Sequence, residues 1–144
     1  MANVFFNSAK KKLWDGSIDL DTDTIKASLH SASYTPSADN HDFFDDVTNE
    51  VSSSGTYTAG AAGGITLANK AVTQDNTNDR AYFDSDDISI TNFTGTFRYV
   101  VLRKDTGTAA TSAVIAAFDL GSDQVLSNGT WSLTLPSTGW FYVS

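Results

Sequence analysis

The chain has 144 residues, of which 40% are hydrophobic and 12% aromatic, and this is enough to build the core of one compact domain. Its 9 Lys and Arg stand against 17 Asp and Glu, and the net charge of −8 argues against a nucleic-acid or anionic-membrane partner. The chain contains no cysteine, which excludes disulfides, a thiol nucleophile and cysteine-ligated metal sites.

Charge is distributed unevenly along the chain. Three lysines at residues 10–12 against Asp15 give residues 1–16 a charge of about +2, which leaves about −10 on residues 17–144. We therefore expect a basic, aromatic N-terminal helical or arm segment over 1–16 and a single β domain over 17–144. The apolar run before the lysines is too short for a secretory signal, so we expect no export.

A short helix is predicted over residues 8–14 (Ser-Ala-Lys-Lys-Lys-Leu-Trp). Asn7 or Ser8 is its expected N-cap, and Gly16 is expected to end it. The aromatic side chains around this helix could be buried at the edge of the core.

A half-buried strand is predicted over residues 24–31, where apolar and polar side chains alternate. Its buried face would carry Ile25, Ala27 and Leu29, and its exposed face would carry Lys26, Ser28 and His30. Residues 39–46 are expected to form a helical turn that presents Phe43 and Phe44 to the core.

The rest of the chain predicts short strands separated by turns. Residues 52–64 are rich in small side chains and are expected to form a loop or irregular edge. A hairpin is predicted from residues 65–73 and 80–84, and further strands are predicted at 87–91, 95–104, 112–120, 130–135 and 139–143.

These strands predict an all-β fold, an antiparallel β-sandwich or barrel with a short N-terminal helix. Residues 95–104 have apolar side chains on both faces and are expected to form a central strand, joined to the next strand by a hairpin through residues 105–108.

One acidic cluster invites a metal interpretation. Asp19, Asp21 and Asp23 have the spacing of the first three ligands of a calcium-binding loop. Thr24 and His30 stand where such a loop needs glycine and glutamate, so the aspartates are expected to form a turn. No metal and no other cofactor is expected.

The sequence shows no catalytic motif. His30 and His41 are the only histidines, and 17 serines and 16 aspartates make a chance Ser–His–Asp set uninformative. We therefore expect no enzymatic activity. The three tryptophans, Trp14, Trp131 and Trp140, could form a sugar-binding surface, but burial in the core is the expected role.

Several segments occur in an order that resembles a widespread family of small structural proteins of tailed bacteriophages. They are residues 16–29 (Gly-Ser-Ile-Asp-Leu-Asp-Thr-Asp-Thr-Ile-Lys-Ala-Ser-Leu), Tyr-Thr-Pro at 34–36, His-Asp-Phe-Phe-Asp-Asp-Val at 41–47, Asp-Asp-Ile at 86–88 and Lys-Asp-Thr-Gly-Thr at 104–108. The resemblance covers most of the chain and contains no catalytic motif.

The resemblance implies a capsid cement or decoration protein, assembled in the host cytoplasm and located on the capsid surface of the virion. Its implied partners are the major capsid protein and further copies of itself in a homotrimer, with no nucleic acid and no membrane. A tail or fibre-associated structural or receptor-binding β module is an alternative. A third is a small hydrolase or a calcium-dependent adhesion module.

The N-terminal segment is expected to supply part of the capsid contact. The candidate contact residues are Phe5, Phe6, Lys10, Lys11, Lys12 and Trp14. Deleting residues 1–16 is then expected to abolish head binding and to leave the β fold intact. The alternative for the aromatic residues and Leu13 is that they form the edge of the domain's own core.

Overall fold

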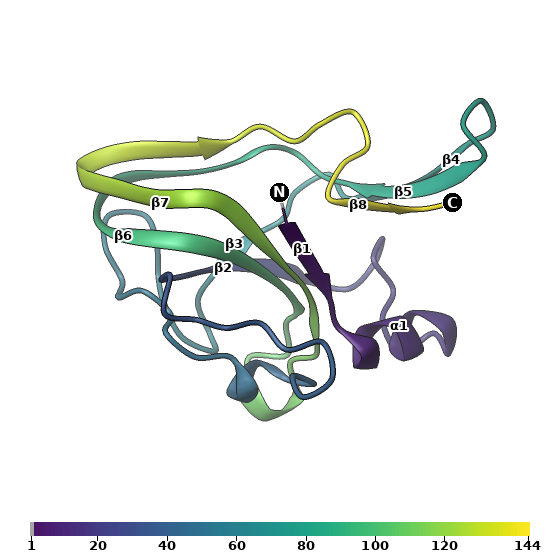
Figure 1. Cartoon of the computed structure of the whole chain (residues 1–144), viewed down its shortest axis with the longest axis horizontal. Helices are drawn as coiled ribbons and strands as arrows, with labels where there is room; N and C mark the ends of the chain where they lie inside the picture. The colour runs from purple at the N-terminus through teal and green to yellow at the C-terminus, as the bar shows by residue number, and fades with distance from the viewer. Residues whose placement is uncertain (1) are drawn as a thin grey trace.

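The protein is mainly β, with two antiparallel sheets and one short α-helix, as predicted (Figure 1). The computed structural model describes residues 2–144; Met1, at the start of the predicted N-terminal segment, lies outside them. The elements are β1 (Ala2–Phe5), α1 (Asn7–Trp14), β2 (Ile25–His30), the 3-10 helix η1 (Phe44–Asp46), β3 (Ile65–Thr66), β4 (Ala71–Asp75), β5 (Arg80–Asp84), β6 (Ile88–Lys104), the 3-10 helix η2 (Ala109–Thr111), β7 (Val114–Leu133) and β8 (Phe141–Val143).

A five-stranded sheet with the order β1-β7-β6-β2-β3 contains the two longest strands. The predicted central strand lies within β6, between β7 and β2. β6 and β7 are each one continuous strand, although turn-forming residues in the sequence predicted two separate strands in the place of each. Bulges make this possible, because Asn92 and Asn128 adopt positive φ angles of 54° and 49° and the two strands resume their pairing beyond them.

A three-stranded sheet with the order β4-β5-β8 packs over one end of the larger sheet. The predicted hairpin around residues 75–79 is confirmed as β4–β5, but its first strand is shorter than predicted. Ile65 and Thr66 form β3 and pair with β2 instead, and Leu67 enters the core.

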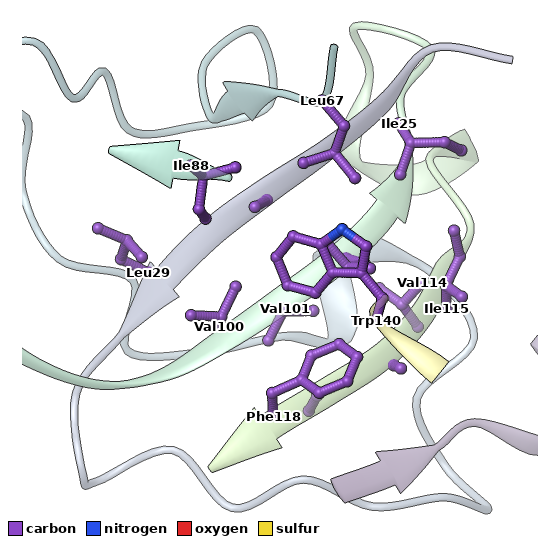
Figure 2. Close-up of a cluster of buried hydrophobic side chains, with 14 of the residues drawn as sticks. Ile25, Leu29, Leu67, Ile88, Val100, Val101, Val114, Ile115, Phe118 and Trp140 are labelled. Atoms are coloured by element: carbon purple, nitrogen blue, oxygen red, sulfur yellow. The ribbon is translucent and has the colours of Figure 1, made fainter. Parts of the chain in front are cut away.

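The main core lies on one face of the larger sheet, and it is covered by Phe83 of β5 and by Leu67 and Trp140 from segments between strands. Figure 2 shows the Trp140 indole above the larger sheet, near Phe118, and their ring centroids are 5.3 Å apart. The indole nitrogen donates a hydrogen bond to Ser85 Oγ at 2.8 Å, so its one polar atom is satisfied. Ile25, Ala27 and Leu29 on β2 are fully buried on this face, as predicted.

The opposite face of β2 is also buried, and the prediction of an exposed face was wrong. Ser28 and His30 have no exposed surface. The connection between β2 and β3 folds back over this face and places Tyr34, Phe44 and Tyr57 against it. Side-chain alternation within one strand contains no information on a distant loop that covers its polar face.

His30 is held as a neutral imidazole in this second core. Its Nδ1 lies 2.8 Å from the carbonyl oxygen of Thr48, which can only accept, so Nδ1 carries the proton and Nε2 accepts from the Ser28 hydroxyl at 2.8 Å. Burial, with a smaller effect of the positive charge on Arg103, lowers the pKa of His30 to about 4.

Acid is therefore expected to destabilise the fold through His30. The unfolded histidine takes up a proton near pH 6.5 and the folded one only near pH 4, so the stability is complete above pH 6.5 and is lost as the pH falls between these values. Between about pH 7 and about pH 4.5 the expected loss is about 2–3 kcal/mol. Urea unfolding at both pH values measures it. Between these two pH values, the free energy of unfolding of His30→Gln should fall by about 2–3 kcal/mol less than that of the wild type. An identical fall in both proteins would contradict the prediction.

The N-terminal segment belongs to the β domain rather than forming a separate arm. β1 pairs with β7 along its whole length, and Phe6 and Ala9 are completely buried. The predicted helix is confirmed as α1, but Phe6 is its N-cap and makes no side-chain capping bond. Packing of Phe6 and Ala9 therefore positions this helix in place of a polar cap.

Candidate interaction surface

An apolar groove of about 780 Å³ lies between α1, the edge strand β1 and the C-terminal strand β8. We call it the α1–β8 groove. It is lined by Asn3, Phe5, Lys10, Leu13, Trp14, Phe141, Tyr142 and Val143.

Large apolar side chains are unusually accessible in this groove. Trp14 is 91% exposed, Val143 69% and Tyr142 54%. The Phe5 and Phe141 rings meet edge to face, with centroids 4.9 Å apart, and tie β1 to β8. Contiguous exposed apolar surface of this kind is typical of a site that contacts another molecule.

Of the three lysines of α1, only Lys10 lines the groove. Its Nζ has no carboxylate partner within the described chain and donates to Asn7 Oδ1 at 2.8 Å. Lys11 forms an ion pair with Asp15 at 2.7 Å. Lys12 lies over the Phe43 ring, 4.0 Å from its centroid, and partial burial lowers the pKa of its ammonium group. Lys10 is therefore the cation that could meet a negative charge in the groove.

The predicted contact residues thus separate into two groups. Phe5, Lys10 and Trp14 meet in the groove, and Lys11 and Lys12 lie on the same helix outside its lining. Phe6 is fully buried and serves the protein's own core, which is the alternative that the sequence left open. Its side chain offers no surface to a partner.

Sequence reasoning missed the contribution of β8 to this surface. Phe141, Tyr142 and Val143 are more than 120 residues from α1, and no local pattern connects them with it. The one available signal was that the predicted strand at 139–143 has apolar side chains on both of its faces, which indicates that neither face is fully exposed to solvent.

The acidic cluster at residues 19–23 forms turn contacts. Asp19 accepts hydrogen bonds from the side chain and the backbone of Thr22 and from the backbone of Asp21, and these bonds lower the pKa of its carboxyl group. Asp23 pairs with Lys104 at 2.9 Å, and Asp21 accepts from the backbone of Val72. Within residues 2–144, no three His, Asp or Glu side chains are grouped as metal ligands.

The histidines and tryptophans do not form shared sites. His41 stacks on Tyr34 and accepts or donates a hydrogen bond at 2.9 Å, separate from the His30–Ser28 contact. Trp140 is buried as expected and Trp131 packs partly buried on Phe97, whereas Trp14 is exposed, so the expectation of core burial was wrong for Trp14.

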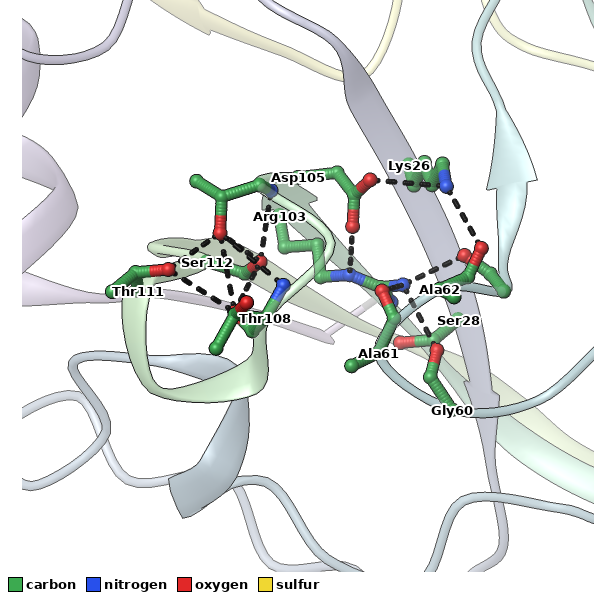
Figure 3. Close-up of polar contacts among 12 residues, drawn as sticks. Lys26, Ser28, Gly60, Ala61, Ala62, Arg103, Asp105, Thr108, Thr111 and Ser112 are labelled. Carbon is green, nitrogen blue, oxygen red and sulfur yellow. Dashed lines mark hydrogen bonds and ion pairs between the residues drawn. The ribbon is translucent and has the colours of Figure 1, made fainter.

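A second polar cluster surrounds the buried Arg103 (Figure 3). Its Nη2 donates to the carbonyl oxygens of Gly60, Ala61 and Gly63, at 3.3, 3.4 and 2.8 Å. The guanidinium lies 3.9 Å from the centroid of the Phe44 ring. Arg103 has no exposed surface, so this cluster anchors the loop at residues 60–64 to the sheet and is closed to ligands from solvent.

Nη1 of Arg103 is buried and has no hydrogen-bond partner within the described residues.

No helix within residues 2–144 is long and apolar enough to cross a membrane. No protein-family model, curated protein or solved structure matches the chain. The resemblance to phage structural proteins therefore rests on the sequence motifs alone.

Proposed function

We propose that this chain is a bacteriophage capsid cement or decoration protein. It binds the outer surface of the head shell and stabilises contacts between neighbouring subunits of the major capsid protein. The order of the sequence motifs supplies the class of protein. The observation that carries the proposal is the α1–β8 groove, where an almost fully exposed tryptophan lies beside a cation on an acidic protein.

The chemistry of the groove suits a lasting contact with another protein. Exposed tryptophan and tyrosine side chains bury large areas when a partner covers them, and such residues dominate the binding energy of protein interfaces. The remaining surface is rich in aspartate, serine and threonine, which suits permanent exposure to solvent at high local concentration.

The copy number of this protein in purified particles tests the proposal. Quantitative mass spectrometry would compare it with the major capsid protein in whole virions and in tail-free heads. We expect near-stoichiometric amounts in both. A few copies that disappear with the tails would favour the tail or fibre alternative, and absence from particles would overturn the structural assignment.

A single substitution should connect head binding with the groove. Trp14→Ser is expected to lower the affinity for heads by about 30-fold, which is the typical loss when a central interface tryptophan is removed. Val125→Ser is the matched control, because Val125 is 75% exposed on β7 and does not line the groove. Sedimentation of each variant with heads that lack the protein measures both affinities, and equal binding by both variants would place the contact elsewhere.

A further inference from the structure

Both sheets present a free edge at the α1–β8 groove. β1 is the outer strand of the larger sheet and β8 is the outer strand of the smaller one. Phe6 N–H donates to Ile115 on β7 and Trp140 N–H donates to Phe83 on β5, at 3.1 and 2.8 Å. The Phe83 carbonyl therefore faces β8, where Phe141 is its register partner. Because backbone groups alternate in direction along a strand, those of Asn3, Phe5 and Tyr142 point away from their own sheets.

These three residues line the groove. Outward-pointing backbone groups on an edge strand are a template for one more strand, which binds through main-chain hydrogen bonds. The edge of β8 is the more accessible of the two, since Tyr142 and Val143 are exposed whereas Val4 and Phe5 on β1 are half-buried. An extended segment, rather than a helix, is therefore the shape that this site accommodates.

The side chains around the edge specify the chemistry of that segment. One wall is apolar, formed by Leu13 and Trp14, and the rim carries Lys10, which has no carboxylate partner within the described chain. An apolar side chain would pack against the tryptophan, and a carboxylate would pair with the lysine. A second copy is less suited in a two-fold arrangement of groove against groove, because it would bring the Lys10 side chains of both chains to one interface.

We infer that the groove binds an extended acidic segment of a partner protein, which pairs with the free edge of β8 as a fourth strand. The segment alternates apolar residues with at least one Asp or Glu that contacts Lys10. This inference rests on the proposed function only for the identity of the partner, which is then the shell subunit. The mode of binding to the groove does not depend on which protein supplies the segment.

The test uses the full chain and a library of random peptides of about ten residues, long enough to span the groove in extended form. We expect enriched peptides to share alternating apolar positions and an acidic residue. The tightest peptide is then synthesised and its dissociation constant is measured with each variant. Enrichment of basic peptides, of peptides with helical spacing, or of none would overturn the inference.

Two pairs of variants separate the contacts. Lys10→Glu should weaken the acidic peptide about tenfold, whereas Lys11→Glu, on the same helix but outside the lining, should change it less than about twofold. A peptide with lysine in place of its acidic residue should regain affinity for Lys10→Glu. Tyr142→Pro removes the N–H that points into the groove and should weaken binding about tenfold, and Tyr142→Val keeps that N–H and should bind more tightly than the proline variant. Equal binding within either pair would contradict the inference.

Other outcomes are equally informative. Reversible self-association in analytical ultracentrifugation that Trp14→Ser abolishes would assign the groove to a second copy and overturn the inference. Near-stoichiometric protein on heads together with unchanged head binding by Lys10→Glu and Tyr142→Pro would support the proposed function and reject this mode of binding. Peptide selection as expected with no protein on particles would reject the proposed function and retain the groove as an edge-strand site.

Discussion

Arg103→Ala is expected to lower the free energy of unfolding by about 3–5 kcal/mol, the range found when one member of a buried charged network is removed. The substitution leaves three carbonyl oxygens of residues 60–63 without their donor and opens a cavity below the Phe44 ring. Asp105 keeps its ion pair with Lys26 at 3.0 Å, so the loss comes mainly from the carbonyls and the cavity.

Urea unfolding of two further variants identifies the cause. Arg103→Lys keeps the charge but cannot reach several carbonyls with a planar group, so it should lose nearly as much stability as the alanine variant. Arg98→Ala removes an arginine from the same strand that forms a two-pronged ion pair with Asp119 at the surface, and it should lose much less. Similar losses for Arg98→Ala and Arg103→Ala would show that the buried carbonyl contacts contribute little.

Deletion of residues 1–16 is expected to abolish cooperative folding, contrary to the sequence-based expectation that the β fold remains intact. The deletion removes β1 from the edge of the five-stranded sheet and removes the fully buried Phe6 and Ala9. Loss of one buried phenylalanine alone costs about 3–5 kcal/mol, and the whole stability of a small domain is about 5–15 kcal/mol.

Circular dichroism during thermal unfolding measures this effect. Lys10→Ala/Lys11→Ala/Lys12→Ala is the matched control, because it removes the positive charge of the segment and leaves β1 and the buried side chains in place. The control should unfold cooperatively, and the deletion variant should show no cooperative transition. A cooperative transition in the deletion variant would mean that the sheets do not depend on β1. If the deletion variant is unfolded, its loss of head binding gives no information on whether residues 1–16 contact the capsid.

The elements that sequence predicted well are those whose signals are local. The period of two over residues 24–31 places β2, and the asparagines and aspartates at 75–79 place the β4–β5 hairpin. The prediction of two short strands in place of β6, and again in place of β7, was wrong because it also used only local signals. Asn92 and Asn128 are typical turn residues, but here their positive φ angles produce bulges within continuous strands.

The site was predictable on one side only. The aromatic and basic character of residues 5–14 is visible in the sequence, and three of the candidate contact residues chosen from it, Phe5, Lys10 and Trp14, line the groove. Which aromatic side chain is buried could not be seen, because Phe5, the last residue of β1, and Phe6, the N-cap of α1, are adjacent and chemically identical. The β8 wall depends on the pairing of β5 with β8, which no local pattern encodes.

The way Arg103 holds the loop at residues 60–64 determines what kinds of sequence change this region can accept. The guanidinium contacts main-chain oxygens, which every amino acid carries, so the identities of Ala61 and Ala62 are not specified by the anchor. Gly63 is different, since a Cβ there would collide with the carbonyl oxygen of Thr58. Gly60 and Gly64 are also constrained, by positive φ angles of 94° and 90°. Ala61 and Ala62 can therefore change over many generations, while the arginine, the glycines and the path of the backbone stay the same.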